Sequence, residues 1–197
     1  MMGATTRAQA LRAAAAGGAA VGVGAVAGGW LRPQPTAGKV SATQDVRILN
    51  FLLVLEEAQA AFYDAALRGG ALRGDLLGFA RIVAAQEREH VDFVRGKLGA
   101  QAGVRPKLDF GRATSDPKRF SAAAIDLEEA TAAAYIGQGA NLTRGVMVDA
   151  ARIVAVEARH AAWIRDLAGA DPAPRAADPP RRAEDVLSEL RRKGYLR

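Results

Sequence analysis

The chain has 197 residues, half of them hydrophobic, with no cysteine and a formal net charge of +6. The lack of cysteine excludes disulfides, zinc–thiolate sites and iron–sulfur clusters. The charge excess lies at the two ends of the chain, because residues 43–170 carry 16 basic and 16 acidic residues. A neutral central region argues against a nucleic-acid-binding protein, so we expect no nucleic-acid partner.

Residues 1–42 have the order of an export signal. Arg7 and Arg12 precede an Ala/Gly/Val run over 13–29, and Val40-Ser41-Ala42 supplies small residues for cleavage. The run is short for a membrane span, and alanine and glycine give it little hydrophobic drive. We therefore predict a cleaved signal and an exported protein, which would be periplasmic, bound in the cell envelope or secreted. A retained anchor and a disordered Ala/Gly arm are the alternatives.

Two helices are predicted in the first part of residues 43–170. The first covers about 43–68, where apolar residues recur at helical spacing, and Gly69-Gly70 ends it. The second begins at Asp75, the predicted N-cap, and ends just before Gly99. The short glycine-containing turn between them predicts antiparallel neighbours.

Two further helices follow a long polar connection over 99–116. Pro117 can open the third helix, which ends near Gly139, and the fourth covers about 143–168. A connection of that length is typical of a crossover along a bundle. The sequence therefore predicts an all-α fold, a four-helix bundle with one long crossover connection over residues 43–170. Residues 171–197 contain four prolines and then a short basic amphipathic helix over 183–193, which would dock on the bundle or on a partner.

The only two histidines in the sequence each follow a glutamate by three positions. Glu87 precedes His90 and Glu157 precedes His160. On a helix this spacing places the carboxylate and the imidazole on one face, so that both reach a common point. Exposed salt-bridge pairs are the alternative, but an apolar stripe surrounds the second pair, where a bare carboxylate would cost several kcal/mol.

Two further glutamates complete a duplicated pattern. Glu56 lies seven residues before Tyr63, and Glu128 lies seven residues before Tyr135, so each pair shares a helix face. The adjacent Glu57 and Glu129 point away from that face and are predicted to be solvated or to support the ligands from outside. Two Glu-x-x-His pairs and one glutamate from each of two other helices form the ligand set of a carboxylate-bridged two-metal site. The predicted metal ligands are Glu56, Glu87, His90, Glu128, Glu157 and His160.

Within this set, we expect Glu56 and Glu128 to be terminal ligands, Glu87 and Glu157 to bridge, and each histidine to bind one metal. Tyr63 and Tyr135 are candidate catalytic residues that hydrogen-bond a ligand carboxylate or relay an electron. The alternative for both is a purely structural role as buried core tyrosines.

These motifs carry a family resemblance. Residues 48–67, residues 127–135 and the segment Val156-Glu157-Ala158-Arg159-His160 together resemble bacterial ferritin-like domain proteins, the group that includes desiccation-related proteins. The resemblance covers about 43–168. It implies a ferritin-like bundle that binds two iron ions, or two manganese ions as in the related catalases, and that reacts with dioxygen or peroxide.

Mixed carboxylate and imidazole ligands suit Fe(II) or Mn(II) better than a closed four-coordinate zinc site. We therefore predict a protein with two Fe ions that oxidises Fe(II) with dioxygen or peroxide in the cell envelope. A non-catalytic metal-binding or stress-related bundle and a catalase-like enzyme with two Mn ions are the alternatives. The sequence leaves open whether the chain forms a homo-oligomer or associates with a membrane through its N-terminus.

Overall fold

The structure, a computed structural model, describes residues 40–197. The described residues form five α-helices and one short 3-10 turn and contain no strand, which confirms the predicted all-α fold. Most of the predicted export signal, residues 1–39, lies outside the described part of the chain. The elements are α2 Ala42–Gly69, α3 Gly74–Leu98, η1 Gly99–Gln101, α4 Pro117–Gly139, α5 Arg144–Leu167 and α6 Ala183–Arg192.

The helix ends follow from capping chemistry. The Ser41 side chain accepts from the backbone N–H of Gln44 at the start of α2, and Asp116 accepts from that of Arg119 at the start of α4. The predicted N-cap of α3 is wrong: Arg73 holds that position, and Asp75 lies in the first turn. In the first turn its carboxylate still interacts favourably with the positive end of the helix dipole.

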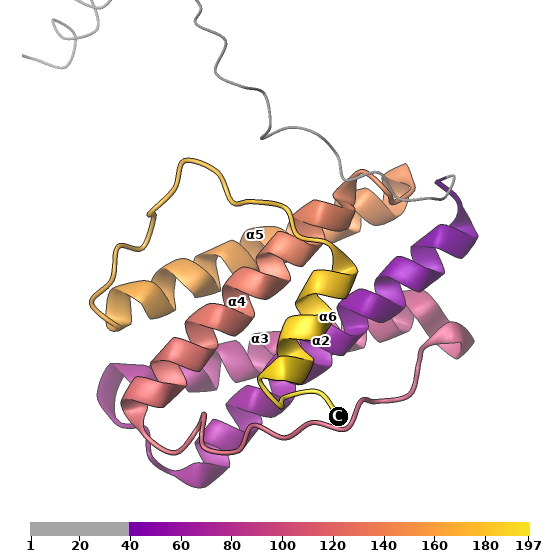
Figure 1. Cartoon of the computed structure of the whole chain (residues 1–197). Coiled ribbons are helices and arrows are strands. Elements are labelled where there is room, and N and C mark those ends of the chain that lie inside the picture. Colours follow the sequence, from indigo (N-terminus) through magenta and orange to yellow (C-terminus); the bar gives the residue numbers. More distant parts are fainter. Residues whose placement is uncertain (1–39) are drawn as a thin grey trace, which may run out of the picture. The chain divides into compact units, whose positions relative to one another are not determined.

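Helices α2 and α3 form one hairpin, and α4 and α5 form the other. Figure 1 shows the connection from α3 to α4 running along the outside of the bundle, as the predicted crossover requires. The two hairpins are also joined by Asp45, which accepts at 2.8 Å from the backbone N–H of Thr143 at the start of α5 and at 2.5 Å from its hydroxyl. In the described part of the chain, no helix is long and apolar enough to cross a membrane.

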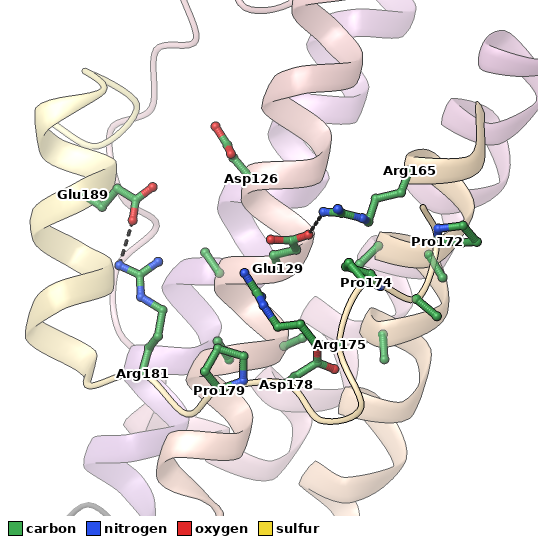
Figure 2. A pocket seen from close by; sticks show the side chains of 17 residues that line it. Asp126, Glu129, Arg165, Pro172, Pro174, Arg175, Asp178, Pro179, Arg181 and Glu189 are labelled. Carbon is green, nitrogen blue, oxygen red and sulfur yellow. Dashed lines mark hydrogen bonds and ion pairs between the residues drawn. The ribbon is translucent and has the colours of Figure 1, made fainter. Parts of the chain in front are cut away.

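The C-terminal segment packs on the bundle. Val186 and Leu190 of α6 are buried, and the backbone N–H of Arg181 donates to the carbonyl of Ala133 at 2.9 Å. The last residues pair with the crossover, where Leu196 forms an isolated antiparallel bridge with Leu108. Between this segment, α4 and α5 lies a cavity of about 490 Å³, which Figure 2 shows with the Glu129–Arg165 and Arg181–Glu189 ion pairs.

Gly137 permits the close crossing of this segment over α4. A Cβ at Gly137 would lie 2.0 Å from the carbonyl oxygen of Arg181. We expect Gly137→Ala to displace the C-terminal segment and to speed tryptic cleavage at Arg175. The matched control is Gly139→Ala, because a Cβ there meets no atom of the described residues within 4 Å. Equal digestion rates for the two variants would contradict this role of Gly137.

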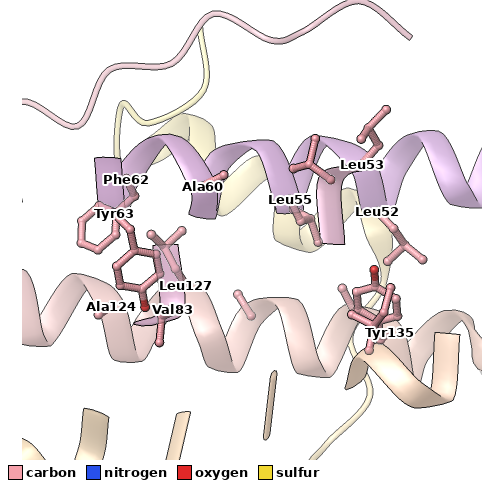
Figure 3. Close-up of a cluster of buried hydrophobic side chains, with 14 of the residues drawn as sticks. Leu52, Leu53, Leu55, Ala60, Phe62, Tyr63, Val83, Ala124, Leu127 and Tyr135 are labelled. Atoms are coloured by element: carbon pink, nitrogen blue, oxygen red, sulfur yellow. The ribbon is translucent and has the colours of Figure 1, made fainter. Parts of the chain in front are cut away.

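The bundle interior is apolar towards its ends and polar at its middle. Around Tyr63, the rings of Phe62, Phe79 and Phe120 pack with centroids 5.2, 5.9 and 5.9 Å from the tyrosine ring. Figure 3 shows Tyr63 on α2 and Tyr135 on α4 reaching into the space between the two helices. The four rings of this cluster are fully buried, and the hydroxyls of Tyr63 and Tyr135 contact the buried carboxylates of Glu128 and Glu56.

Candidate metal centre

All six predicted metal ligands meet in the interior of the bundle. Each helix of the bundle contributes ligands. Helices α2 and α4 supply one glutamate each, and α3 and α5 supply one Glu-x-x-His pair each. The four carboxylates are fully buried, and the two imidazoles are nearly so. The side chains fall into two groups whose ligand atoms lie within 4.8 Å of one another. One group is Glu56, Glu87, His90 and Glu157, and the other is Glu87, Glu128, Glu157 and His160.

Glu87 and Glu157 belong to both groups, as bridging ligands would. Glu87 turns one oxygen towards each histidine: Oε2 lies 3.5 Å from Nδ1 of His90, and Oε1 lies 3.0 Å from Nδ1 of His160. Glu157 Oε1 lies 2.9 Å from Nδ1 of His90. The terminal positions are equivalent in the two halves, with Glu56 Oε2 3.4 Å from His90 Nδ1 and Glu128 Oε2 3.4 Å from His160 Nδ1.

Within residues 40–197, several of these buried atoms have no hydrogen-bond partner. They are one oxygen of Glu56, both of Glu87 and one of Glu157, together with Nδ1 of His90 and Nδ1 of His160. The contacts among them are close, yet none has hydrogen-bond geometry. Buried polar atoms are almost always satisfied, and each unsatisfied one costs about 1–3 kcal/mol. A cluster of unsatisfied atoms that converge on one place is what a cation site leaves in a metal-free protein.

The two tyrosines bond across the bundle. The hydroxyl of Tyr63 donates to Glu128, and that of Tyr135 donates to Glu56, so each tyrosine fixes the carboxylate of the opposite hairpin. Burial raises the pKa of both hydroxyls, and the carboxylates they contact raise it further. Both hydroxyls therefore stay protonated and available as donors.

Gln59 is a site residue that the sequence interpretation missed. It is fully buried one turn after Glu56, and its amide Nε2 donates to Glu128 Oε2 and to Glu157 Oε2, each at 3.0 Å. The matching position on α4 is Thr131, which cannot span two carboxylates. A sequence signal existed, since Gln59 lies three residues after a predicted ligand and therefore on its face.

Glu57 and Glu129 lie outside the two ligand groups, and each of them forms an ion pair with an arginine. Arg95 contacts Glu57, and Arg165 contacts Glu129, so each hairpin has an arginine–glutamate pair between its two helices. The prediction of a solvated side chain is wrong for Glu57, which is 3% exposed. The guanidinium of Arg95 provides the compensating charge that allows this burial.

Burial and mutual repulsion keep extra protons in the metal-free centre. Burial raises the pKa of Glu87 well above 4.5, with further contributions from Glu157 and Glu128. Burial also raises the pKa of Glu128 to about 7, against the opposing effect of His160. Burial lowers the pKa of each histidine, but the nearby carboxylates outweigh it, so that the pKa of His160 rises to about 10 and that of His90 is also raised.

The metal-free bundle should therefore lose stability as the pH rises. A carboxyl group whose pKa is raised on folding destabilises the fold above its unfolded pKa, here between 4.5 and about 7 for Glu128. A histidine with a raised pKa adds stability that is complete below 6.5 and is lost as the pH rises through about 10, as for His160. Both effects have the same sign. Melting of the metal-free protein at pH 6 and pH 9 checks this, and an equal or higher midpoint at pH 9 would contradict it.

A cavity of about 330 Å³ between α3 and α5 lies beside both histidines. We call it the mouth. Glu89 and Arg159 lie at the mouth as exposed groups of opposite charge, and the ring of Trp163 is also exposed there. The other residues that line the mouth are Gln86, His90, Val156 and His160. The mouth therefore offers room for a small molecule or ion beside the two imidazoles.

Comparison with known proteins agrees with this geometry. A family model described as ferritin-like domain matches residues 44–170, which is more than half of the chain. The match is to the family as a whole, so the desiccation-related group stays a prediction. A comparison with curated proteins found no match. The chain therefore belongs to the ferritin-like domain family.

Proposed function

We propose that the centre binds two divalent metal ions, one beside each histidine, bridged by Glu87 and Glu157. The convergence of the buried, unsatisfied carboxylate and imidazole atoms supports this most directly. The charges also match, because four carboxylates and two neutral imidazoles are neutralised by two divalent cations. Without such cations the buried carboxylates repel one another, which is costly.

The donor set favours iron, with manganese as the second candidate. Carboxylate oxygens and imidazole nitrogens suit Fe(II) and Mn(II), and the mouth leaves room for a further small ligand. When bound, a pair of iron ions would supply redox chemistry with dioxygen or peroxide, and we propose oxidation of Fe(II) as the reaction. This reaction would make the protein a metal-dependent oxidoreductase, and its role would be to protect the cell envelope.

The protein's own residues would hold the site and control its protons. Tyr63 and Tyr135 fix one oxygen of each terminal carboxylate, which leaves the other oxygen directed at the centre. Gln59 holds Glu128 and Glu157 in register. Metal binding would displace the protons that the histidines and Glu87 retain, so binding should release protons and strengthen with rising pH.

Metal analysis followed by an activity assay tests the proposal. The metal-depleted full chain is loaded anaerobically with Fe(II) or Mn(II), and we expect about two ions per chain. Exposure of the Fe(II) form to dioxygen or peroxide should then oxidise the iron faster than in the Glu87→Gln variant. Loading without turnover would support the non-catalytic alternative, oxygen release from peroxide by the Mn(II) form would support the catalase-like one, and no loading would contradict the proposal.

We also propose that the protein acts outside the cytoplasm, on the basis of the order of basic, apolar and small residues in 1–42. Deletion of residues 1–39 should trap the protein in the cytoplasm. The bundle should still fold and bind metal, because α2 and its Ser41 cap are retained. Fractionation of cells expressing the two forms checks this. An intact full-length chain confined to the cytoplasm would overturn the export proposal alone.

A further inference from the structure

The two halves of the centre differ at the residue before each Glu-x-x-His pair. On α3 this residue is Gln86, and on α5 it is Val156. Both line the mouth. The pairs are otherwise equivalent in spacing, in burial of the glutamate and in the direction of each histidine Nδ1 towards the carboxylates. The difference between an amide and an alkyl side chain therefore falls next to the ligands of an otherwise duplicated site.

Gln86 bonds the imidazole of the opposite hairpin. Its Oε1 lies 2.6 Å from Nε2 of His160. A metal can bind Nδ1 of His160 only if that nitrogen carries no proton, so the ring proton must be on Nε2. An amide oxygen is an acceptor and is placed to receive that proton's hydrogen bond, which fixes both the tautomer and the ring orientation.

His90 has no such support. Val156 offers it no acceptor, and among residues 40–197 its ring contacts the carboxylates of the centre and stacks on the ring of His160. Its side chain is also more accessible, at 11% against 3% for His160. No described side chain therefore fixes the tautomer of His90 from outside the ligand set, and its ring is partly open to water at the mouth.

We propose that Gln86 is a positioning residue that makes the metal position beside His160 the tighter of the two. The position beside His90 exchanges its ion through the mouth. This inference rests on the proposed two-metal function and adds that the two metal positions differ in affinity, so that one ion is held and the other is exchanged. In other proteins, partners that orient a metal-binding histidine from outside the ligand set change metal affinity by about 10–100-fold.

Anaerobic titration of the full chain with Co(II), followed by visible absorption and by competition with a chelator, tests the proposal. We expect two binding steps of different affinity. Gln86→Met keeps the shape but removes the acceptor, so it should weaken the tighter step by about 10–100-fold. Gln86→Glu restores an acceptor and should retain the tight step. Val156→Gln supplies an acceptor near His90 and should strengthen the weaker step.

The metal-free melting midpoints of the variants serve as the control for intact folding. Two steps of equal affinity in the unsubstituted chain would overturn the proposal, as would equal weakening by Gln86→Met and Gln86→Glu, which would indicate a packing effect. Both of these results would leave the two-metal function standing. If the unsubstituted chain bound no Co(II), the proposed function would fail together with this inference.

Discussion

Replacing either Glu87 or Glu157 by glutamine should remove most of the bound metal. Each of these residues belongs to both ligand groups, so one substitution weakens both metal positions. The neutral amide has a similar shape but neither the charge nor the second equivalent oxygen that a bridging ligand needs. We expect the metal content to fall from about two ions per chain to well below one.

Glu129→Gln is the matched control for this experiment. Glu129 is adjacent to Glu128 on the same helix, but it pairs with Arg165 and lies outside both ligand groups. Its replacement should leave the metal content unchanged. Glu56→Gln and Glu128→Gln should have an intermediate effect, because each residue serves a single group. If Glu87→Gln and Glu129→Gln lost metal equally, the choice of ligands would be wrong.

Metal loading should raise the melting temperature of the bundle substantially. Ions that bind only the folded chain stabilise it by about 2.7 kcal/mol per site at a hundredfold excess over the dissociation constant. For a chain of this size, 1 kcal/mol corresponds to about 2–4 °C in the melting midpoint, so two sites together imply roughly 10–20 °C. Calorimetry with and without saturating Fe(II) or Mn(II) measures this shift.

Glu87→Gln should stabilise the metal-free bundle and remove most of the stabilisation that metal provides. The raised pKa of Glu87 shows that the metal-free fold disfavours its charge. The neutral variant should therefore melt above the metal-free unsubstituted protein at neutral pH and gain little when metal is added. A variant that was less stable without metal and still stabilised by it would argue that Glu87 has an ordinary structural role.

Helical periodicity was the basis for most of the correct predictions about the helices and the site residues. The seven-residue spacing from Glu56 to Tyr63 and from Glu128 to Tyr135 identified which glutamate of each adjacent pair faces the interior, and the structure places Glu56 and Glu128 there. Most helix boundaries could also be predicted, because glycines and Pro117 mark them locally. These features depend on the chain within one or two helical turns, where sequence patterns are strongest.

Contacts between helices could not be predicted in the same way. Nothing in the spacing of residues indicated that Tyr63 would bond Glu128 rather than a carboxylate of its own helix, because the pairing depends on how the hairpins face one another. The burial of Glu57 likewise depends on Arg95, which lies on the next helix. Gln59 and Gln86 were missed for a related reason: an amide is a common surface residue, and only its bonds to ligands give it a role.

Anomalous diffraction from crystals of the Mn(II)-loaded full chain would locate the metal ions themselves. We expect two peaks in the bundle interior, one beside Nδ1 of His90 and one beside Nδ1 of His160, with Glu87 and Glu157 between them. Metal-loaded crystals whose interior showed no peak, with the four carboxylates hydrogen-bonded to one another or to water, would contradict the two-metal proposal.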